Sequence, residues 1–137
     1  MTPESLALTH AAAFGGTGWP AQDFQQYLAD KTVLIFGDAE CFAVMRVLGP
    51  EAEILTLATH PDKQGTGRAT ALLDGALAKL GTANVTEVFL DVADDNAAAL
   101  ALYRRCGFTQ FATRNNYYAS GASAICMKAL LSPASPR

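Results

Sequence analysis

Cysteine is scarce in this chain of 137 residues, and its three cysteines form no Cys-x-x-Cys pair. The sequence therefore argues against a disulfide framework and against a zinc site, and we expect no bound metal. Cys41, Cys106 and Cys126 stand among apolar neighbours, where a free thiol behaves as a small core residue. This usage is typical of a reducing compartment, so we expect a cytoplasmic protein.

An excess of basic residues is also missing, because the formal net charge is −3. Binding to a phosphate backbone needs a basic face, so nucleic acid is not the expected partner. Met1–His10 lacks the basic patch and apolar run of a secretory signal. The apolar stretches are far shorter than a membrane span, so no membrane partner is expected either.

The composition that is present is that of an ordinary globular domain, with 50% hydrophobic and 17% charged residues. At this length one domain can bury a hydrophobic core that is stable without disulfides or bound metals. We expect a single domain over residues 1–131, followed by a disordered Pro/Ser-rich tail over residues 132–137.

Hydrophobic periodicity and turn residues divide the chain into helices and strands. Two helices are expected first, one through Phe14, with Thr2 as a possible cap, and one over Pro20–Ala29. The expected strands are Thr32–Phe36, Phe42–Leu48, Ile54–Thr59, Val85–Val92, Phe108–Thr113 and Ser123–Leu130. Two further amphipathic helices are expected from Gly67 to Gly81 and from Asn96 to Cys106. This order predicts an α/β (α+β) fold, with a mixed sheet and helices on both faces.

A glycine-containing segment, Gln64-Gly65-Thr66-Gly67-Arg68-Ala69, lies between an expected strand and an expected helix. Glycines let successive backbone N–H groups point into one concavity, and the helix behind adds unpaired N–H groups and the positive end of its dipole. This arrangement suits a phosphate. A tight turn that needs glycine only for its dihedral angles is an equally good explanation of this segment alone.

Two common nucleotide-binding patterns fit this segment poorly. The P-loop pattern, with Gly-Lys-Ser/Thr after four intervening residues, is absent. A Rossmann interpretation would use Gly65 and Gly67 for the pyrophosphate and Asp91 for a ribose. The third glycine position is Thr70, however, and Asp91 comes later than that motif expects, so we rank this alternative low.

The helix expected at Asn96 carries two further candidate residues. Asn96 is a good N-cap, and Tyr103 lies two helical turns later on roughly the same face. The structural explanation is a cap and a core aromatic, and for each residue alone it is the stronger one.

Taken together, these pieces resemble the acetyl-CoA motifs of the GNAT superfamily. The matching phrases are His60-Pro61-Asp62, Gln64 to Ala69, Asn96 to Tyr103 and Gly107-Phe108. Within the superfamily the chain is most similar to the RimI-like ribosomal-protein-alanine N-acetyltransferases, on Leu90-Asp91-Val92 and Arg114-Asn115-Asn116-Tyr117-Tyr118. The resemblance extends from about residue 10 to about residue 130.

The resemblance implies a GNAT fold, in which a mostly antiparallel mixed sheet contains a central splayed pair of parallel strands. It implies acetyl-CoA as co-substrate, with the pantetheine arm along the backbone of Leu57, Ala58 and Thr59. The pyrophosphate would bind to Gln64, Gly65, Thr66, Gly67, Arg68 and Ala69. Asn96 would bind the cofactor arm, and Tyr103 would protonate the departing thiolate. A thiol with a pKa of about 8.5 and a tyrosine with a pKa of about 10 are well enough matched for that transfer.

The general base is the weaker part of the implied mechanism. Asp91 stands where the subgroup has a glutamate, which is longer by one methylene, and aspartate is a weak base at neutral pH. Burial or a bridging water would help it. Glu53, Asp94, Asp95 and His60 are the alternatives, although ordinary surface or turn roles explain each of them.

Two further departures affect the expected structure. The segment before Gly65 is about two residues shorter than in the subgroup, and Asp62 would repel a pyrophosphate nearby. The family's first strand is also missing, because the chain begins with a helix. The edge of the strand at Thr32–Phe36 would then be open unless a partner or a tail covers it. A homodimer is a possible assembly.

Three functions remain open from the sequence. The first is an acetyltransferase acting on a primary amine, either the N-terminal α-amine of a ribosomal or other protein or a small molecule. The second is a GNAT-like domain that binds acetyl-CoA without catalysis. The third, a nucleotide-binding or Rossmann-type module, is the weakest, and the acceptor amine is not readable from the sequence.

Overall fold

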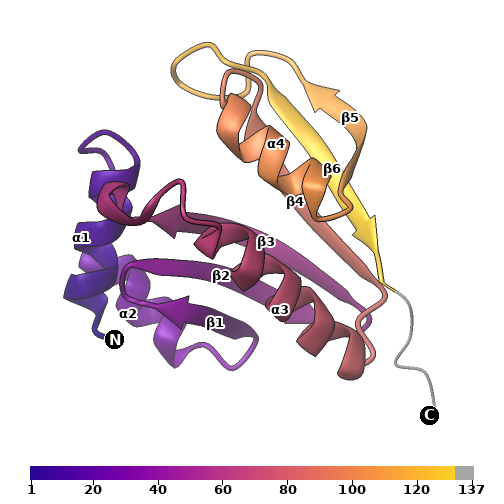
Figure 1. The fold of residues 1–137 in the computed structure, drawn as a ribbon, viewed down its shortest axis with the longest axis horizontal. Coiled ribbons are helices and arrows are strands. Elements are labelled where there is room, and N and C mark those ends of the chain that lie inside the picture. Colours follow the sequence, from indigo (N-terminus) through magenta and orange to yellow (C-terminus); the bar gives the residue numbers. More distant parts are fainter. Residues whose placement is uncertain (132–137) are drawn as a thin grey trace.

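A computed structural model describes residues 1–131 of the chain, and the predicted tail over residues 132–137 lies outside the described residues. The sheet has the strand order β1-β2-β3-β4-β6-β5 (Figure 1). Its helices and strands are α1 (Pro3–Ala13), α2 (Ala21–Ala29), β1 (Val33–Asp38), β2 (Cys41–Leu48), β3 (Glu51–Thr59), η1 (Pro61–Lys63), α3 (Arg68–Thr82), β4 (Glu87–Ala93), α4 (Ala97–Arg105), β5 (Thr109–Arg114) and β6 (Ala124–Leu130).

The predicted helix starts agree with the caps in the structure. The Thr2 hydroxyl accepts from the Ser5 N–H at 3.0 Å and so caps α1. The Asn96 side chain accepts from the Ala99 N–H at 3.1 Å and caps α4. Each cap satisfies an amide that the first helical turn leaves unpaired, which fixes where the helix begins.

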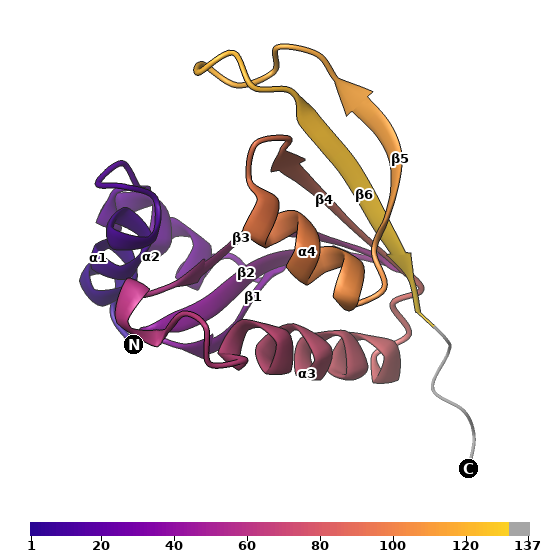
Figure 2. The same ribbon diagram turned by 45° about the horizontal axis from the view of Figure 1, so that its top comes forward.

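The two faces of the sheet are covered by different helices, as Figures 1 and 2 show. One hydrophobic cluster joins α1 and α2 to β1, β2 and β3 through Leu6, Phe24, Phe42 and Val44. A larger cluster joins α3 and α4 to the opposite face, where alternate residues such as Ala43 and Met45 point. This confirms the predicted layering of helices on both faces.

The two halves of the sheet meet along a short parallel ladder between β3 and β4. Only Glu51, Ala52 and Glu53 of β3 are paired with β4, opposite Glu87, Val88 and Phe89. Beyond that point the strands diverge (Figure 2). Every other neighbouring pair is antiparallel. This is the predicted splayed pair, and it leaves one side of the later part of β3 without a strand partner.

Of the two edge strands of the sheet, β1 and β5, the one at β1 is where an open edge was predicted. β1 is outermost on that side of the sheet and pairs with β2 alone.

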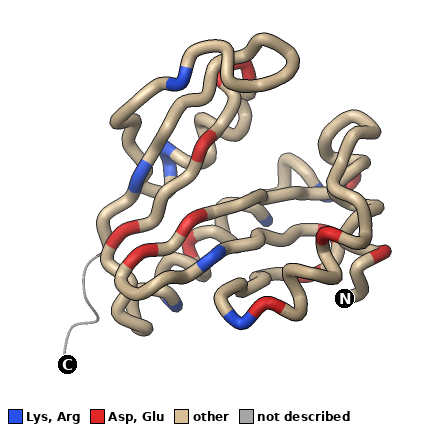
Figure 3. Tube along the Cα trace, turned by 180° about the vertical axis from the view of Figure 1, so that it is seen from behind, with Lys and Arg blue, Asp and Glu red and all other residues tan. Residues whose placement is uncertain are grey.

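Basic and acidic positions are intermixed across the rear of the molecule (Figure 3). No helix within residues 1–131 is long and apolar enough to span a bilayer.

Candidate active site

The loop between β3 and α3 adopts a backbone that requires glycine. Gly65 and Gly67 have φ values of +75° and +81°, in the left-handed region, and Gly67 is the N-cap of α3. A Cβ atom added at either position would meet nothing within 4 Å. The glycines are therefore needed for backbone conformation, and they also leave open space beside the loop.

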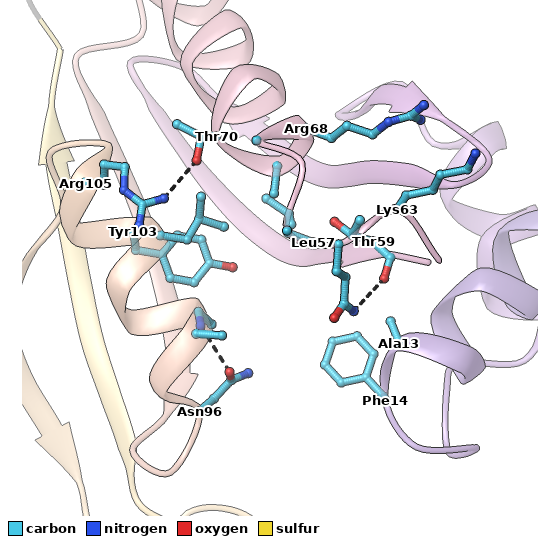
Figure 4. A pocket seen from close by; sticks show the side chains of 17 residues that line it. Ala13, Phe14, Leu57, Thr59, Lys63, Arg68, Thr70, Asn96, Tyr103 and Arg105 are labelled. Atoms are coloured by element: carbon cyan, nitrogen blue, oxygen red, sulfur yellow. Dashed lines mark hydrogen bonds between the residues drawn. The ribbon is translucent and has the colours of Figure 1, made fainter. Parts of the chain in front are cut away.

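Unpaired amides and basic side chains gather at this loop. The Ala71 N–H donates to the Gly67 carbonyl at 3.0 Å, so the amides before it precede the first hydrogen bond of the helix. Lys63 of η1 and Arg68, the first residue of α3, line the cavity beside this loop (Figure 4). The combination of free N–H groups, a helix N-terminus and two cations suits an anion such as a pyrophosphate.

A cavity of about 450 Å³ lies between this loop, β3 and α4 (Figure 4). It lies beside the later part of β3, which has no strand partner on that side. Of the predicted site residues it brings together Leu57, Thr59, Gln64, Gly65, Gly67, Arg68, Ala69, Asn96 and Tyr103.

Tyr103 is buried in α4, with 7% of its surface exposed, and its hydroxyl points into the cavity (Figure 4). The ring packs edge-on against Phe108, with centroids 5.7 Å apart. Burial, with a smaller contribution from Tyr118, raises the pKa of the Tyr103 hydroxyl well above its usual range. The phenol is thus protonated at neutral pH and available as a hydrogen-bond donor.

Asn96 and Arg105 fix the position of α4 beside the cavity. The Asn96 oxygen is used by the cap, which leaves its side-chain NH₂ as the free donor on the cavity wall (Figure 4). Arg105 donates to the Thr70 hydroxyl at 3.1 Å and so ties α4 to α3 across the gap. The structural role predicted for Asn96 is therefore confirmed, and a ligand-binding role remains compatible with it.

The later part of β3 contributes to the cavity the side chains that point toward α3 and α4. Leu57 and Thr59 line the cavity, whereas the Ala58 side chain is buried on the α1–α2 face. Only the backbone of Ala58 is thus available to a ligand. The Gln64 side-chain amide donates to the Thr59 carbonyl at 3.0 Å, so that acceptor is already engaged. Thr66 does not line the cavity, and its hydroxyl donates to the Lys63 carbonyl at 2.8 Å.

Asp91 lies on the other face of the sheet. Its β4 neighbours Leu90 and Val92 point into the core beneath α3 and α4, so Asp91 points away from α4. The carboxylate is partly exposed, and its Oδ2 lies 3.9 Å from Nη1 of Arg114. A ligand reaching both Asp91 and Tyr103 would therefore have to pass through the gap between β3 and β4.

The other candidate bases have local roles. His60 accepts from the Asp62 N–H at 3.2 Å and caps η1, as expected for a turn histidine. Asp94 accepts from the Ser123 N–H at 3.3 Å. Glu53 and Asp95 are exposed. Asp62 turns outward, with 84% of its side chain exposed, and is absent from the cavity wall. The repulsion expected between Asp62 and a bound anion stays a prediction, with the carboxylate placed outside the cavity wall.

Sequence reasoning missed several residues that line the cavity. Ala13 and Phe14 arrive from the end of α1, and Phe14 is 41% exposed (Figure 4). Lys63, Thr70, Leu102 and Arg105 also belong to the wall. Only Lys63 could have been found from the sequence, because it is a cation next to the glycine loop. Nothing local indicates that the end of α1 reaches across to β3.

Comparisons with known proteins agree with this geometry. Residues 19–108 match the model of the acetyltransferase (GNAT) family. The [ribosomal protein bS18]-alanine N-acetyltransferase of Escherichia coli K12 is 38% identical over 82 residues, which cover 60% of this chain and 55% of that enzyme. The match thus spans little more than half the length of this relative.

Two further similarities are to a solved structure and to a second acetyltransferase sequence. The crystal structure of the Escherichia coli ribosomal-protein-S18-alanine N-acetyltransferase superimposes with a TM-score of 0.86 and 29% identity, covering 98% of this chain and 91% of that one. A mycothiol acetyltransferase of Geodermatophilus obscurus is 47% identical over 66 residues, which cover 47% of this chain and 21% of that protein. With its splayed sheet, its glycine loop and a family match over most of its length, this chain belongs to the GNAT acetyltransferase family.

Proposed function

We propose that this protein transfers the acetyl group of acetyl-CoA to a primary amine, and that the acceptor is the N-terminal α-amine of a protein, as in the RimI-like enzymes. The observation that carries the proposal is the single cavity shared by the glycine loop, Asn96 and the Tyr103 hydroxyl. The similarity to the bS18-alanine N-acetyltransferase supports the acceptor class.

Acetyl-CoA would supply an acetyl group activated as a thioester. In this proposal the free amides from Gly65 to Ala69 bind its pyrophosphate, with Lys63 and Arg68 as counter-charges. The Asn96 amide donates to the pantetheine arm. The backbone of Leu57 and Ala58 offers further hydrogen bonds where β3 has no partner strand.

Tyr103 is the proposed proton donor to the departing thiolate. Burial makes its phenol a weaker acid than in water, but the same desolvation makes a thiolate in the cavity more basic. The match between the two groups therefore depends on both being buried together. Comparing the pKa values of a thiol and a tyrosine in water is therefore only a first step.

Asp91 is the proposed acceptor-side carboxylate. It would hold the ammonium form of the amine and receive its proton, directly or through a water molecule. Its position on the face opposite α4 implies that the amine enters from that face, while the thioester is held on the other. A cytoplasmic location completes the proposal, supported by the free thiols of Cys41, Cys106 and Cys126.

Release of free thiol from acetyl-CoA tests this function. The assay would compare peptides that begin with alanine, the same peptides with a blocked N-terminus, and small amines. Release that requires the free α-amine supports the proposal. Preference for a small amine would favour the second candidate, a small-molecule acetyltransferase, to which the similarity with mycothiol acetyltransferase points. Binding of acetyl-CoA without release in any mixture would contradict catalysis.

A further inference from the structure

The surroundings of Asp91 form a small polar cluster on the face of the sheet that α4 does not cover. Cys126 of β6 is its direct cross-strand neighbour, and Arg114 ends β5 on the far side of β6. Tyr118 follows in the loop between β5 and β6. Three segments thus converge on one carboxylate.

Charge links these groups. The Asp91 carboxylate raises the pKa of the Arg114 guanidinium above its usual range. Burial first, and then the Asp91 carboxylate, raise the pKa of the Tyr118 hydroxyl and of the Cys126 thiol. Tyr118 and Cys126 therefore stay neutral at neutral pH, and of these three residues Arg114 alone is charged.

The ion pair between Arg114 and Asp91 is long and exposed. The distance of 3.9 Å between Nη1 and Oδ2 is too long for a hydrogen bond. The Arg114 side chain is 58% exposed, and its guanidinium also lies 5.4 Å from the centre of the Tyr117 ring. The guanidinium thus lies near the Tyr117 ring as well as near Asp91, and the contact with the ring would remain if the guanidinium moved away from the carboxylate.

An acceptor amine reaches the protein mainly as an ammonium ion, and Asp91 is the carboxylate proposed to receive it. Two cations then compete for one carboxylate. We infer that Arg114 is a specificity-determining residue whose guanidinium competes with the acceptor ammonium for Asp91, and that it leaves the carboxylate but keeps its contact with Tyr117 when the acceptor binds. This inference rests on the proposed function, which it deepens by assigning the acceptor-side competitor.

The expected consequence is that Arg114 weakens acceptor binding without affecting the acetyl donor. Losing an exposed ion pair of this kind changes an equilibrium by about two- to fivefold. In Arg114→Gln we therefore expect the acceptor KM and the acceptor Kd to fall by about that factor. The KM for acetyl-CoA and kcat should remain within about twofold of the wild type.

The experiment compares Arg114→Gln with Arg114→Lys, which keeps the competing charge and should stay near the wild type. Arg104→Gln removes an exposed arginine from the last turn of α4 and is the matched control. Thiol release gives KM for an alanyl peptide. Calorimetry gives Kd for the same peptide on the protein saturated with CoA, and this measurement needs no turnover.

The outcomes separate the inference from the proposed function. Lower acceptor KM and Kd in Arg114→Gln alone would support the inference. Unchanged or higher values, with thiol release intact, would overturn it and leave the acetyltransferase function standing. A peptide that binds to none of the proteins and releases no thiol would overturn both.

Discussion

At the scale of single residues, the packing of Tyr103 can be separated from its proposed role as a proton donor. The Tyr103 ring packs on Phe108, while its hydroxyl reaches the cavity. Tyr103→Phe keeps the ring and removes only the hydroxyl. We expect turnover to fall by about 100-fold, the usual lower range for loss of a positioned proton donor. Acetyl-CoA affinity, measured by calorimetry, should stay within about twofold, and equal turnover in the two proteins would remove Tyr103 from the mechanism.

His10 is a buried residue whose protonation state affects folding. The Trp19 N–H donates to His10 Nδ1 at 2.9 Å, so the ring is neutral, with its proton on Nε2, and donates to the Thr56 hydroxyl at 2.8 Å. Burial lowers its pKa from 6.5 to about 4. In this way the ring links the loop between α1 and α2 to β3.

Acidification is therefore expected to destabilise the protein through His10. Between pH 6.5 and about 4, His10 is protonated in the unfolded chain but neutral in the folded chain. The free energy of unfolding therefore decreases as the pH falls. The shift corresponds to roughly 3 kcal/mol at most. Urea unfolding across this range should show a flatter pH dependence for His10→Gln. His60→Gln, which changes the other histidine, should retain the wild-type slope.

At the scale of helices and strands, the Asn96 cap allows two roles to be separated. Asn96→Ala removes both the cap and the free amide, and should cost about 1 kcal/mol of stability and weaken acetyl-CoA binding. Asn96→Asp keeps an oxygen for the Ala99 N–H but lacks the NH₂ group. It should unfold like the wild type while binding acetyl-CoA about fivefold more weakly. Wild-type affinity in Asn96→Asp would show that Asn96 is only a cap.

Substitution by alanine is expected to change stability in opposite directions at two glycines, one at the start of α3 and one inside it. Gly67 has a φ of +81°, where alanine is strained by about 1 kcal/mol, so Gly67→Ala should destabilise the protein. Gly75 lies inside α3, and an added Cβ would meet nothing within 4 Å. Gly75→Ala should therefore stabilise the protein by about 0.5–1 kcal/mol. Denaturant unfolding of both variants checks this, and effects of the same sign would contradict it.

The sequence was informative where local patterns decide the structure. The predicted strands at Phe42–Leu48 and Ser123–Leu130 start within one residue of β2 and β6. β3 begins earlier than predicted, at Glu51 instead of Ile54, because exposed glutamates alternate with buried residues there and hide the strand in the hydrophobic pattern. Glycine-loop and cap positions were also predictable, since both follow from backbone geometry.

Contacts between distant segments were not predictable in the same way. The contribution of Phe14 to the cavity depends on how α1 packs over β3, and the Arg114–Asp91 pair depends on the order of β4, β6 and β5. Neither leaves a periodic signal in the chain. The resemblance to a known family supplied the site roles, which remain predictions for the cofactor-binding and catalytic residues.

At the scale of the whole molecule, the cavity joins two halves of the sheet whose strands pair with each other, within residues 1–131, only through the short ladder between β3 and β4. A ligand that contacts both halves binds the folded state alone. At 100 times its Kd, acetyl-CoA should add about 2.7 kcal/mol of stability. For a chain of this length that raises Tm by roughly 5–10 °C. Thermal unfolding with acetyl-CoA and with NAD checks this, and a comparable shift with NAD would revive the nucleotide-binding alternative.

The position of β1 at the rim of the sheet matters for handling the protein. Its outer peptide groups have no strand partner within residues 1–131, and Leu34 on the same strand is 45% exposed. Such a rim is a template onto which another extended chain can add, and proteins usually blunt it with charge or proline. Concentration-driven self-association, if it occurs in storage or crystallisation, should begin along this strand.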